Sequence, residues 1–330
     1  MTLIQKLPIV ILLACVACSG SHSKETPQTE PVELQLQVSA PFHFVVYGDS
    51  RFHDPKDAEA ANPPARQALV QAIAQANPAL ICFTGDIVYN GYDKDDWKIF
   101  DAETAVWREK HIPVYPTLGN HDLHGSEQAA LGNYFERFPD LKNSVYYSLR
   151  AANMLMLVLD SALDETAGPQ GEWLTKKLDH LPGDVDFVLI MLHHPPYTSS
   201  SDDKMFGGGH SSRSQEQALA KMLEARQQNL RARIVVFSGH VHNYERHEHG
   251  GVTYIVTGGA GAHAYPIERG KDDPFQSKEV NYHYVQVEDG EGKLKLTMNR
   301  LDLTSGKAVW TQPDSVTISV PTAKAAAQSK

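Results

Sequence analysis

Leu80-Ile81-Cys82-Phe83-Thr84-Gly85-Asp86-Ile87-Val88-Tyr89 begins as an apolar run and breaks at a glycine and an aspartate. Strands of a parallel sheet deliver their last residues to one shared edge, where open α/β folds build their sites. The same arrangement, polar residues at the end of an apolar strand-like run, therefore predicts one common site wherever it recurs. It recurs in four further segments, Gly48-Asp49-Ser50-Arg51, Gly119-Asn120-His121-Asp122, His193-His194-Pro195-Pro196 and Gly239-His240-Val241-His242.

Composition sets the outer bounds for the fold and the ligands. A chain of 330 residues with 42% hydrophobic content can bury a large core. We expect one domain over residues 41–320, because the five segments span most of that stretch and need a common edge. The formal net charge of -10 argues against a nucleic-acid partner, since such binding rests on many lysine and arginine contacts.

The N-terminus predicts an export signal. Lys6 precedes an apolar run over 7–17, which is too short to span a membrane but fits the core of a signal peptide. The run resembles a bacterial lipoprotein cleavage box at either Cys15 or Cys18, and the alternative is an ordinary secretory signal with incidental cysteines. We expect a lipoprotein-type signal over 1–18, a flexible tether over 19–40, and a lipid-anchored protein of the bacterial cell envelope, periplasmic or on the surface. The remaining cysteine, Cys82, lies in an apolar run and is interpreted as a buried small hydrophobe.

Strands and helices alternate from residue 41. Asn62 followed by Pro63 marks a helix start, and Ser214 with Gln217 has the spacing of a capping box. Alternation of this kind indicates parallel strands joined by crossover helices. Strands are expected at 43–47, 80–84, 154–159, 187–192, 233–237 and 254–257, and helices at 63–73, 97–110, 172–181 and 214–228. After residue 280 three strands, 282–288, 293–303 and 316–320, are expected to complete a second sheet, followed by a disordered tail over 321–330.

The polar residues at the strand ends form a ligand set for metal ions. Asp49 and Asp86 each follow a glycine at the end of an apolar run, where a carboxylate gains nothing from burial unless a positive charge waits for it. The oxygen and nitrogen donors together suit iron, zinc or manganese. Paired metals roughly 3.5–4 Å apart are the usual device for hydrolysing phosphate esters. The remaining members of the set are Asn120, His193, His240 and His242.

These ordered motifs resemble the calcineurin-like metallophosphoesterase superfamily over residues 41–300. The resemblance implies an α/β fold, a four-layer αββα sandwich of two mixed β-sheets flanked by helices. It also implies two metal ions bridged by Asp86, with Asn120, His193 and His240 completing the shell of the second ion and Asp49 and His242 binding the first. His194 is then a neighbour of the site and not a ligand.

One position departs from the superfamily pattern. Most members carry a histidine ligand where this chain has Arg51, and arginine keeps its proton and cannot ligate. Tyr89, three residues after the bridging aspartate, is placed to substitute. Gly-Asp-x-x-Tyr without the first histidine resembles the purple acid phosphatase branch, as do Gly239-His240-Val241-His242-Asn243-Tyr244-Glu245-Arg246 and Gly258-Gly259-Ala260-Gly261. That branch implies Fe(III) at the first position and Fe(II), Zn or Mn at the second.

The resemblance to this branch is incomplete and leaves alternatives open. Its members usually have glycine at the position of Arg51, and the larger ones carry an N-terminal β-sandwich for which residues 19–40 leave no room. Tyr89 has the alternative of a packed strand-end aromatic, with His53 as a rival ligand. Arg51 either contacts the substrate phosphate or pairs with a carboxylate.

The implied activity is hydrolysis of small phosphate monoesters through in-line attack by a metal-bound hydroxide. By resemblance His121 steadies or protonates the leaving oxygen, and Asp122 orients the His121 ring. His210 is a candidate for a second contact to the leaving group, its alternative being a solvated histidine in a glycine-rich loop. Other functions considered are a phosphodiesterase acting on cyclic nucleotides or phospholipid headgroups, and a non-catalytic surface-anchored binding lipoprotein.

Overall fold

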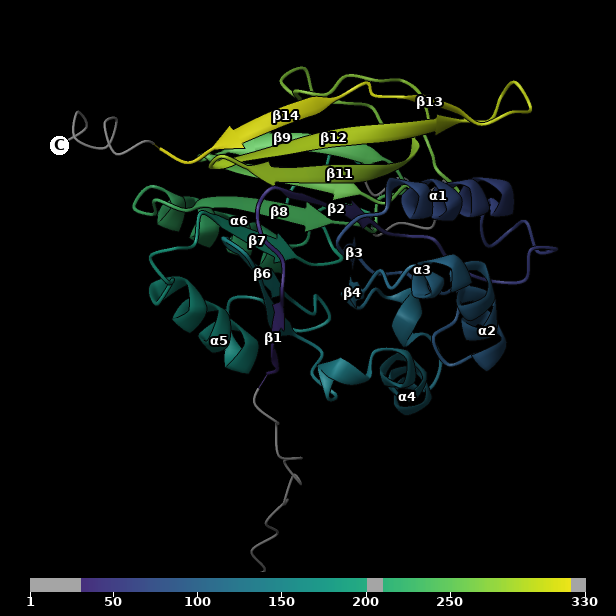
Figure 1. Ribbon diagram of the computed structural model, residues 1–330, viewed down its shortest axis with the longest axis horizontal. Coiled ribbons are helices and arrows are strands. Elements are labelled where there is room, and N and C mark those ends of the chain that lie inside the picture. Colours follow the sequence, from purple (N-terminus) through teal and green to yellow (C-terminus); the bar gives the residue numbers. More distant parts are fainter. Residues whose placement is uncertain (1–30, 201–209, 322–330) are drawn as a thin grey trace, which may run out of the picture. The chain divides into compact units, whose positions relative to one another are not determined.

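Two mixed β-sheets are packed between helices in the computed structural model, which describes residues 31–200 and 210–321 (Figure 1). In this part of the chain the first sheet has the strand order β1-β5-β6-β7-β8-β10-β9. Its strands are β1 (Glu33–Leu36), β5 (Tyr147–Ala151), β6 (Met154–Val158), β7 (Phe187–Met191), β8 (Arg233–Ser238), β10 (Val252–Thr257) and β9 (Tyr244–His249).

The second sheet has the order β13-β12-β11-β2-β3-β4, with β14 pairing β12 beside β13. Strands β2, β3 and β4 are parallel to one another, whereas β11 pairs β2 in antiparallel register. The expected strands after residue 280 are confirmed, and they extend this sheet. Its strands are β13 (Val309–Thr311), β12 (Lys293–Asp302), β11 (Tyr282–Gly290), β2 (Phe42–Tyr47), β3 (Ile81–Phe83), β4 (Val114–Pro116) and β14 (Ser315–Ser319).

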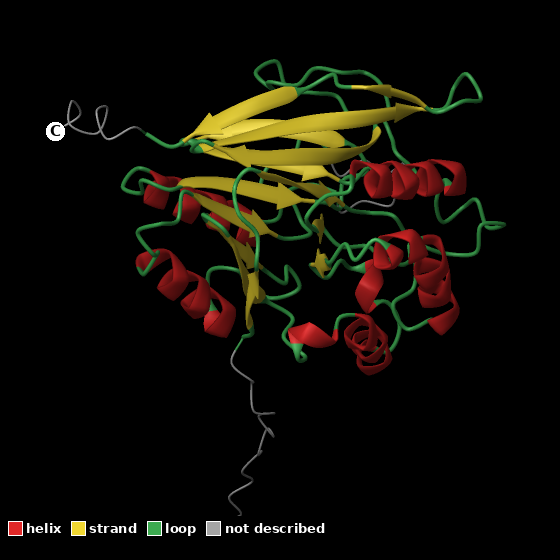
Figure 2. Ribbon diagram, in the orientation of Figure 1, coloured by secondary structure: helices red, strands yellow, loops and turns green. Residues whose placement is uncertain are grey.

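Helices cover the outer faces of both sheets, which confirms the four-layer sandwich (Figure 2). Leu174 of α5 and Leu219 of α6 pack on the first sheet, and Leu69 of α1 belongs to the core that also fills the space between the sheets. Strands covered on both faces are apolar throughout, as in Phe187-Val188-Leu189-Ile190-Met191. The helices are α1 (Pro63–Ala76), α2 (Lys94–Glu103), α3 (Ala105–Glu109), α4 (Glu127–Arg137), α5 (Gly168–Asp179) and α6 (Ser214–Gln227), with 3₁₀ turns η1 (His121–Leu123) and η2 (Pro139–Leu141).

Helix α1 begins where the sequence predicts. The Asn62 side chain accepts a hydrogen bond from Ala65 N at 3.1 Å, and Pro63 occupies the first helical position. The helix ends at Asn77, which has φ of 51° in the left-handed region that asparagine tolerates. This crossover fixes the parallel pairing of β2 with β3.

Three local expectations differ from the structure. The expected tether over 19–40 is wrong in its last part, because β1 pairs in parallel with β5 from Glu33 to Leu36. The expected helix over 97–110 is two helices, since Thr104 ends α2 and its hydroxyl bonds the carbonyl of Phe100. No capping box forms at α6, where Arg213 is the N-cap residue and Ser214 already belongs to the helix.

The predicted signal over 1–18 lies outside the described residues, and so does the predicted tail over 321–330 except for residue 321. Among the helices that the structure does describe, none combines the length and apolarity that a membrane span requires.

Candidate metal centre

The predicted ligands come together from both sheets. Asp49, Asp86 and Asn120 follow the parallel strands β2, β3 and β4 of the second sheet, while His193 and His240 follow the parallel strands β7 and β8 of the first. The sequence led us to expect one shared sheet edge. The carboxyl ends of two sheets supply the site instead, since β3 and β7 belong to different sheets.

Strained backbone turns the ligands out of their strands. Asp49, Asp86 and His240 have φ of 63°, 52° and 68°, in a region that non-glycine residues rarely adopt and that concentrates at functional sites. The glycines beside them allow close approach. A Cβ on Gly119 would lie 2.2 Å from Asp86 N, and one on Gly239 would lie 2.4 Å from Asp49 Oδ2.

Four ligand atoms converge at what we call the second metal position. His193 Nε2 lies 3.0 Å from Asn120 Oδ1, 3.2 Å from His240 Nδ1 and 3.4 Å from Asp86 Oδ1, and His240 Nδ1 lies 3.1 Å from Asn120 Oδ1. Two ligands bound about 2.1 Å from one ion, at tetrahedral or octahedral angles, lie roughly 3.0–3.4 Å apart. The observed separations are therefore those of ligands arranged around a single cation.

The tautomer of His193 supports this arrangement. Its Nδ1 lies 2.9 Å from the carbonyl oxygen of Thr84, which can only accept, so Nδ1 carries the proton. In the neutral ring Nε2 is then a bare lone pair facing the lone pairs of Asn120 Oδ1 and Asp86 Oδ1. A backbone carbonyl that fixes the ligand tautomer in this way is typical of metal-binding histidines.

Asp49 and His242 define what we call the first metal position. His242 Nδ1 donates to His263 O at 3.0 Å, which leaves the lone pair on Nε2. His242 Nε2 lies 3.8 Å from Asp49 Oδ1, and within the described residues this buried atom has no hydrogen-bond partner. A buried nitrogen without a partner is costly unless a cation completes it. Asp49, Asp86 and His193 also each offer a ligand atom within 4.8 Å of the others.

Burial sets the charges of the centre. Burial, with the neighbouring Asp86, raises the pKa of Asp49 well above its usual range. Burial also acts to raise the pKa of Asp86, but the Arg51 guanidinium and the backbone N–H of His121 help to hold it below its usual range. Burial lowers the pKa of both His193 and His242, which favours the neutral, metal-binding imidazole. Two adjoining carboxyl groups, Asp49 and Asp86, together with neutral imidazoles, form a donor set that suits a pair of cations.

Arg51 contacts the centre at Asp86, the residue predicted to bridge the two metal ions. Its Nη2 donates to Asp86 Oδ2 at 3.3 Å, on the oxygen opposite the second metal position. Of the two roles considered for Arg51, this geometry shows the carboxylate pair. The Arg51 side chain keeps 16% of its surface exposed, while its Nε is buried and has no hydrogen-bond partner among the described residues.

Tyr89 lies between two imidazole rings. Its ring centroid is 5.2 Å from that of His121 and 5.2 Å from that of His53. His53 is engaged elsewhere, because its Nδ1 bonds Asp96 and its Nε2 lies 3.2 Å from Asp57 Oδ2. The rival interpretation of His53 as a metal ligand is therefore disfavoured, and Tyr89 as a ligand stays a prediction.

The expected role of Asp122 differs from the structure. Its buried carboxylate accepts from three backbone N–H groups, those of Ile87 at 2.9 Å, Val88 at 3.2 Å and Gly119 at 2.9 Å. The His121 ring is oriented instead by the backbone, since Nδ1 lies 2.8 Å from Tyr89 O. Asp122 thus ties the loop after β3 to the loop after β4, and it shapes the centre without touching the His121 ring.

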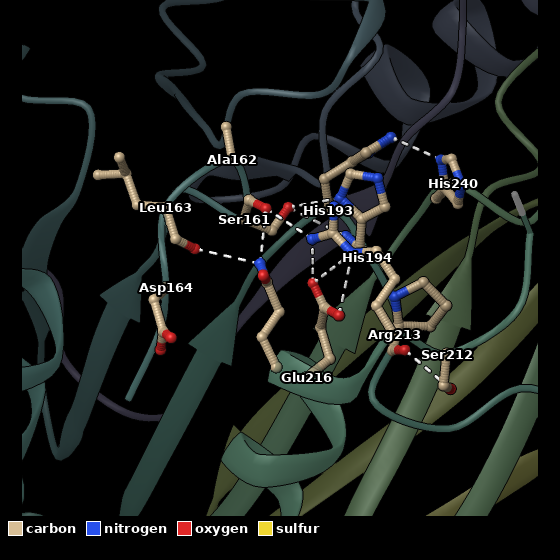
Figure 3. A network of polar contacts seen from close by, with 12 residues as sticks. Ser161, Ala162, Leu163, Asp164, His193, His194, Ser212, Arg213, Glu216 and His240 are labelled. Carbon is tan, nitrogen blue, oxygen red and sulfur yellow. Dashed lines mark hydrogen bonds and ion pairs between the residues drawn. The ribbon is translucent and has the colours of Figure 1, made fainter. Parts of the chain in front are cut away.

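Two further histidines border the ligands. The predicted residue His210 stacks on His240 with centroids 4.9 Å apart, which places it beside the centre. His194 packs 4.3 Å from His240 and 5.0 Å from His193, and its Nδ1 lies 2.8 Å from Ser161 Oγ. Figure 3 shows Ser161 linking His194 to Arg213 and Glu216. Sequence reasoning missed this network because its polar members come from separate segments without a local motif.

A family model described as calcineurin-like phosphoesterase matches residues 42–244, more than half of the chain. The chain belongs to this family. Comparison with curated proteins gave no match.

Solved structures share the fold of this phosphoesterase. Purple acid phosphatase PPD1 from yellow lupin (Lupinus luteus) seeds has 17% identity and a TM-score of 0.64 over 86% of this chain and 54% of its own, so this phosphoesterase spans about half of the lupin enzyme. A dimetal phosphatase from Danio rerio has 14% identity and a TM-score of 0.56 over 85% of this chain and 100% of its own. GAP50, the anchor in the inner membrane complex of Plasmodium, has 15% identity and a TM-score of 0.58 over 86% of this chain and 90% of its own.

Proposed function

We propose that this phosphoesterase is a dinuclear-metal phosphatase that hydrolyses small phosphate monoesters. The convergence of Asp86 Oδ1, Asn120 Oδ1, His193 Nε2 and His240 Nδ1 at spacings of 3.0–3.4 Å carries the proposal. Asp49 and His242 would hold the first cation, and Asp86 would bridge the pair. When bound, paired cations lower the pKa of water toward neutrality and offset the charge on phosphoryl oxygens.

His121 is proposed to exchange a proton with the leaving oxygen of the substrate. Its Nδ1 donates to Tyr89 O, so the opposite nitrogen, Nε2, is the atom that can face a substrate. Its backbone N–H donates to Asp86 Oδ1 at 2.9 Å, which fixes the residue relative to the bridging carboxylate. A group held at the reacting centre in this way contributes through position as much as through acidity.

Arg51 is proposed to contact the substrate phosphate as well as Asp86. The Arg51 side chain is partly exposed, and a guanidinium beside Asp86 can direct N–H groups at a phosphoryl oxygen. His210, stacked on His240, is proposed as a second contact to the leaving group.

For the metals, we propose Fe(III) at the first position, bound by the Tyr89 phenolate, with Fe(II), Zn or Mn at the second. The likeness of fold to a purple acid phosphatase supports this choice, as does the half-buried position of Tyr89 beside His121.

Turnover of matched substrates tests the activity. Metal-loaded protein is assayed on an aryl phosphate monoester and on the matching diester, with Asp86→Asn as the inactive control. We expect clear monoester turnover that the control lacks. High turnover of the diester with negligible turnover of the monoester would favour the phosphodiesterase alternative. If Asp86→Asn kept both activities, a catalytic site at Asp86 would be refuted.

Export to the cell envelope with a lipid anchor at Cys15 or Cys18 is also proposed. It is supported by the apolar run over 7–17 alone, in residues that the structure does not describe. Labelling of wild type, Cys15→Ser and Cys18→Ser with a radioactive fatty acid identifies the anchored cysteine, because the variant that lacks it should not be labelled. Full labelling of both variants, or no labelling of wild type, would contradict a lipid anchor at Cys15 or Cys18.

A further inference from the structure

His194 lies against both imidazoles of the second metal position without belonging to the ligand set. Its ring is tilted by 45° against His240 and stands edge-on to His193 at 84°. The residue is half-buried, so part of its side chain borders solvent beside the centre.

One hydroxyl group fixes the state of this ring. Ser161 Oγ accepts from the backbone N–H of His194 at 3.2 Å and lies 2.8 Å from His194 Nδ1. Among the described residues, Nδ1 is the acceptor within reach of the Ser161 hydroxyl proton. The hydroxyl therefore donates to Nδ1, and in the neutral ring the proton is on Nε2.

The exposed edge of the ring carries this Nε2–H group. The backbone N and Nδ1 of His194 both face Ser161, which is 1% exposed, so the accessible part of the side chain is the opposite edge. The same ring packs against His193 and His240, which would hold the second cation, with centroids 5.0 and 4.3 Å away.

Ser161 is itself held firmly. Arg213 Nη2 donates to the carbonyl oxygen of Ser161 at 2.6 Å, and Gln215 Nε2 donates to the same oxygen at 3.3 Å. Glu216, fully buried in α6, fixes Arg213 through bonds from Nε at 3.0 and 3.1 Å (Figure 3). Such support shells are what hold a binding group within its productive geometry.

We propose that His194 donates a hydrogen bond from Nε2 to the phosphoryl group of the substrate, and that Ser161 is the positioning residue that sets this tautomer. The inference rests on the proposed function, because it requires a phosphate at the metal centre. It adds a second protein donor to the phosphate, beside the second metal position, with the same role as the one proposed for Arg51.

Two substitutions of His194 separate this role from a structural one. The amide nitrogen of Gln can occupy the place of Nε2, whereas the amide of Asn reaches only the place of Nδ1. We would load wild type, His194→Gln and His194→Asn with Mn²⁺, measure metal per chain, and titrate each with inorganic phosphate by calorimetry. A hydrogen bond to a charged acceptor is worth about tenfold or more in affinity.

The expected result is that His194→Asn binds phosphate roughly tenfold more weakly than wild type, and that His194→Gln recovers most of the loss, with equal metal content in all three. Ser161→Ala should weaken phosphate binding less than His194→Asn does. Wild-type affinity in His194→Asn, a greater loss in His194→Gln, or loss of metal from either variant would overturn the inference and leave the proposed function standing. Metal-loaded wild type that binds no phosphate would overturn both.

Discussion

His193 Nε2 lies 3.0 Å from Asn120 Oδ1, although neither atom carries a proton for the other. The proton of His193 is on Nδ1, where it bonds the carbonyl of Thr84. Two lone pairs at this distance repel unless a cation lies between them. This arrangement supports the proposal that the two residues bind one cation, and it argues against an ordinary structural hydrogen bond.

Asn120→Ala tests that distinction. Removing one lone pair should weaken Mn²⁺ binding at least tenfold, while the metal-free protein should unfold at the same or a higher temperature. Calorimetric titration and thermal unfolding in a chelator measure the two effects. Asn133→Ala is the control, because Asn133 donates to Gly91 O and Tyr92 O and its loss should lower stability without a direct effect on metal binding. If Asn120→Ala unfolded at a lower temperature in chelator and bound Mn²⁺ as tightly as wild type, the contact between Asn120 and His193 would be an ordinary hydrogen bond, and the ligand assignment would be contradicted.

Tyr89→Phe tests the phenolate ligand. If Tyr89 binds Fe(III), the oxidised iron-loaded protein should absorb visible light through charge transfer, and the variant should lose that band. Tyr92→Phe is the matched control, because Tyr92 is 48% exposed and should leave the band in place. A colourless wild type that is fully active with only zinc or manganese would refute the tyrosinate assignment.

Arg51→Gln should change metal and phosphate binding in opposite directions. The guanidinium lies 3.3 Å from Asp86, so its removal takes a positive charge away from the cations and should tighten binding of the first metal several-fold. Phosphate loses a cationic partner, and KM for the monoester should rise about tenfold or more. Metal titration and steady-state kinetics measure the two. Arg150→Gln, which loses an ion pair to the exposed Asp184, serves as control. If Arg51→Gln weakened the binding of both metal and phosphate, the role of Arg51 would be purely structural.

Glu165 makes stability depend on pH. Burial and the neighbouring Glu216 raise the pKa of Glu165 from 4.5 to about 8. Below pH 4.5 Glu165 is protonated in both the folded and the unfolded protein. Between pH 4.5 and about 8 the unfolded protein loses this proton while the folded protein keeps it, so the free energy of unfolding falls as pH rises. Glu165→Gln should therefore unfold with less pH dependence and gain on the order of 2 kcal/mol relative to wild type at pH 8. Urea unfolding at pH 5 and pH 8 measures this. The exposed Glu172→Gln should behave like wild type, and an unchanged pH slope in Glu165→Gln would exclude the carboxyl pair as its source.

The convergence of several predicted ligand residues could be predicted because those residues follow buried strands. Asp86, His193 and His240 come shortly after apolar runs that form β3, β7 and β8, so the sequence indicates that they lie at the carboxyl ends of strands. The split of these strands between two sheets could not be predicted, because runs buried on both faces look alike in either sheet. β1 was missed for a related reason, since a short edge strand with alternate exposure resembles a polar linker.

Contacts between distant segments explain the remaining differences. Asp122 follows Asn120 and His121 in sequence, yet its carboxylate bonds the backbone of Ile87 and Val88, a pairing that only the packed loops reveal. His53 has the right residue type for a ligand, but Asp96 of α2 takes its Nδ1. Motifs identify residue types at strand ends, whereas hydrogen-bond partners decide which of them face the cations.

Anomalous diffraction from crystals of the protein grown with Mn²⁺ tests the paired-metal centre most directly. The geometry predicts two peaks roughly 3.5–4 Å apart on either side of Asp86, one bounded by Asn120, His193 and His240 and the other by Asp49 and His242. A single peak, or peaks away from Asp86, would contradict the dinuclear centre.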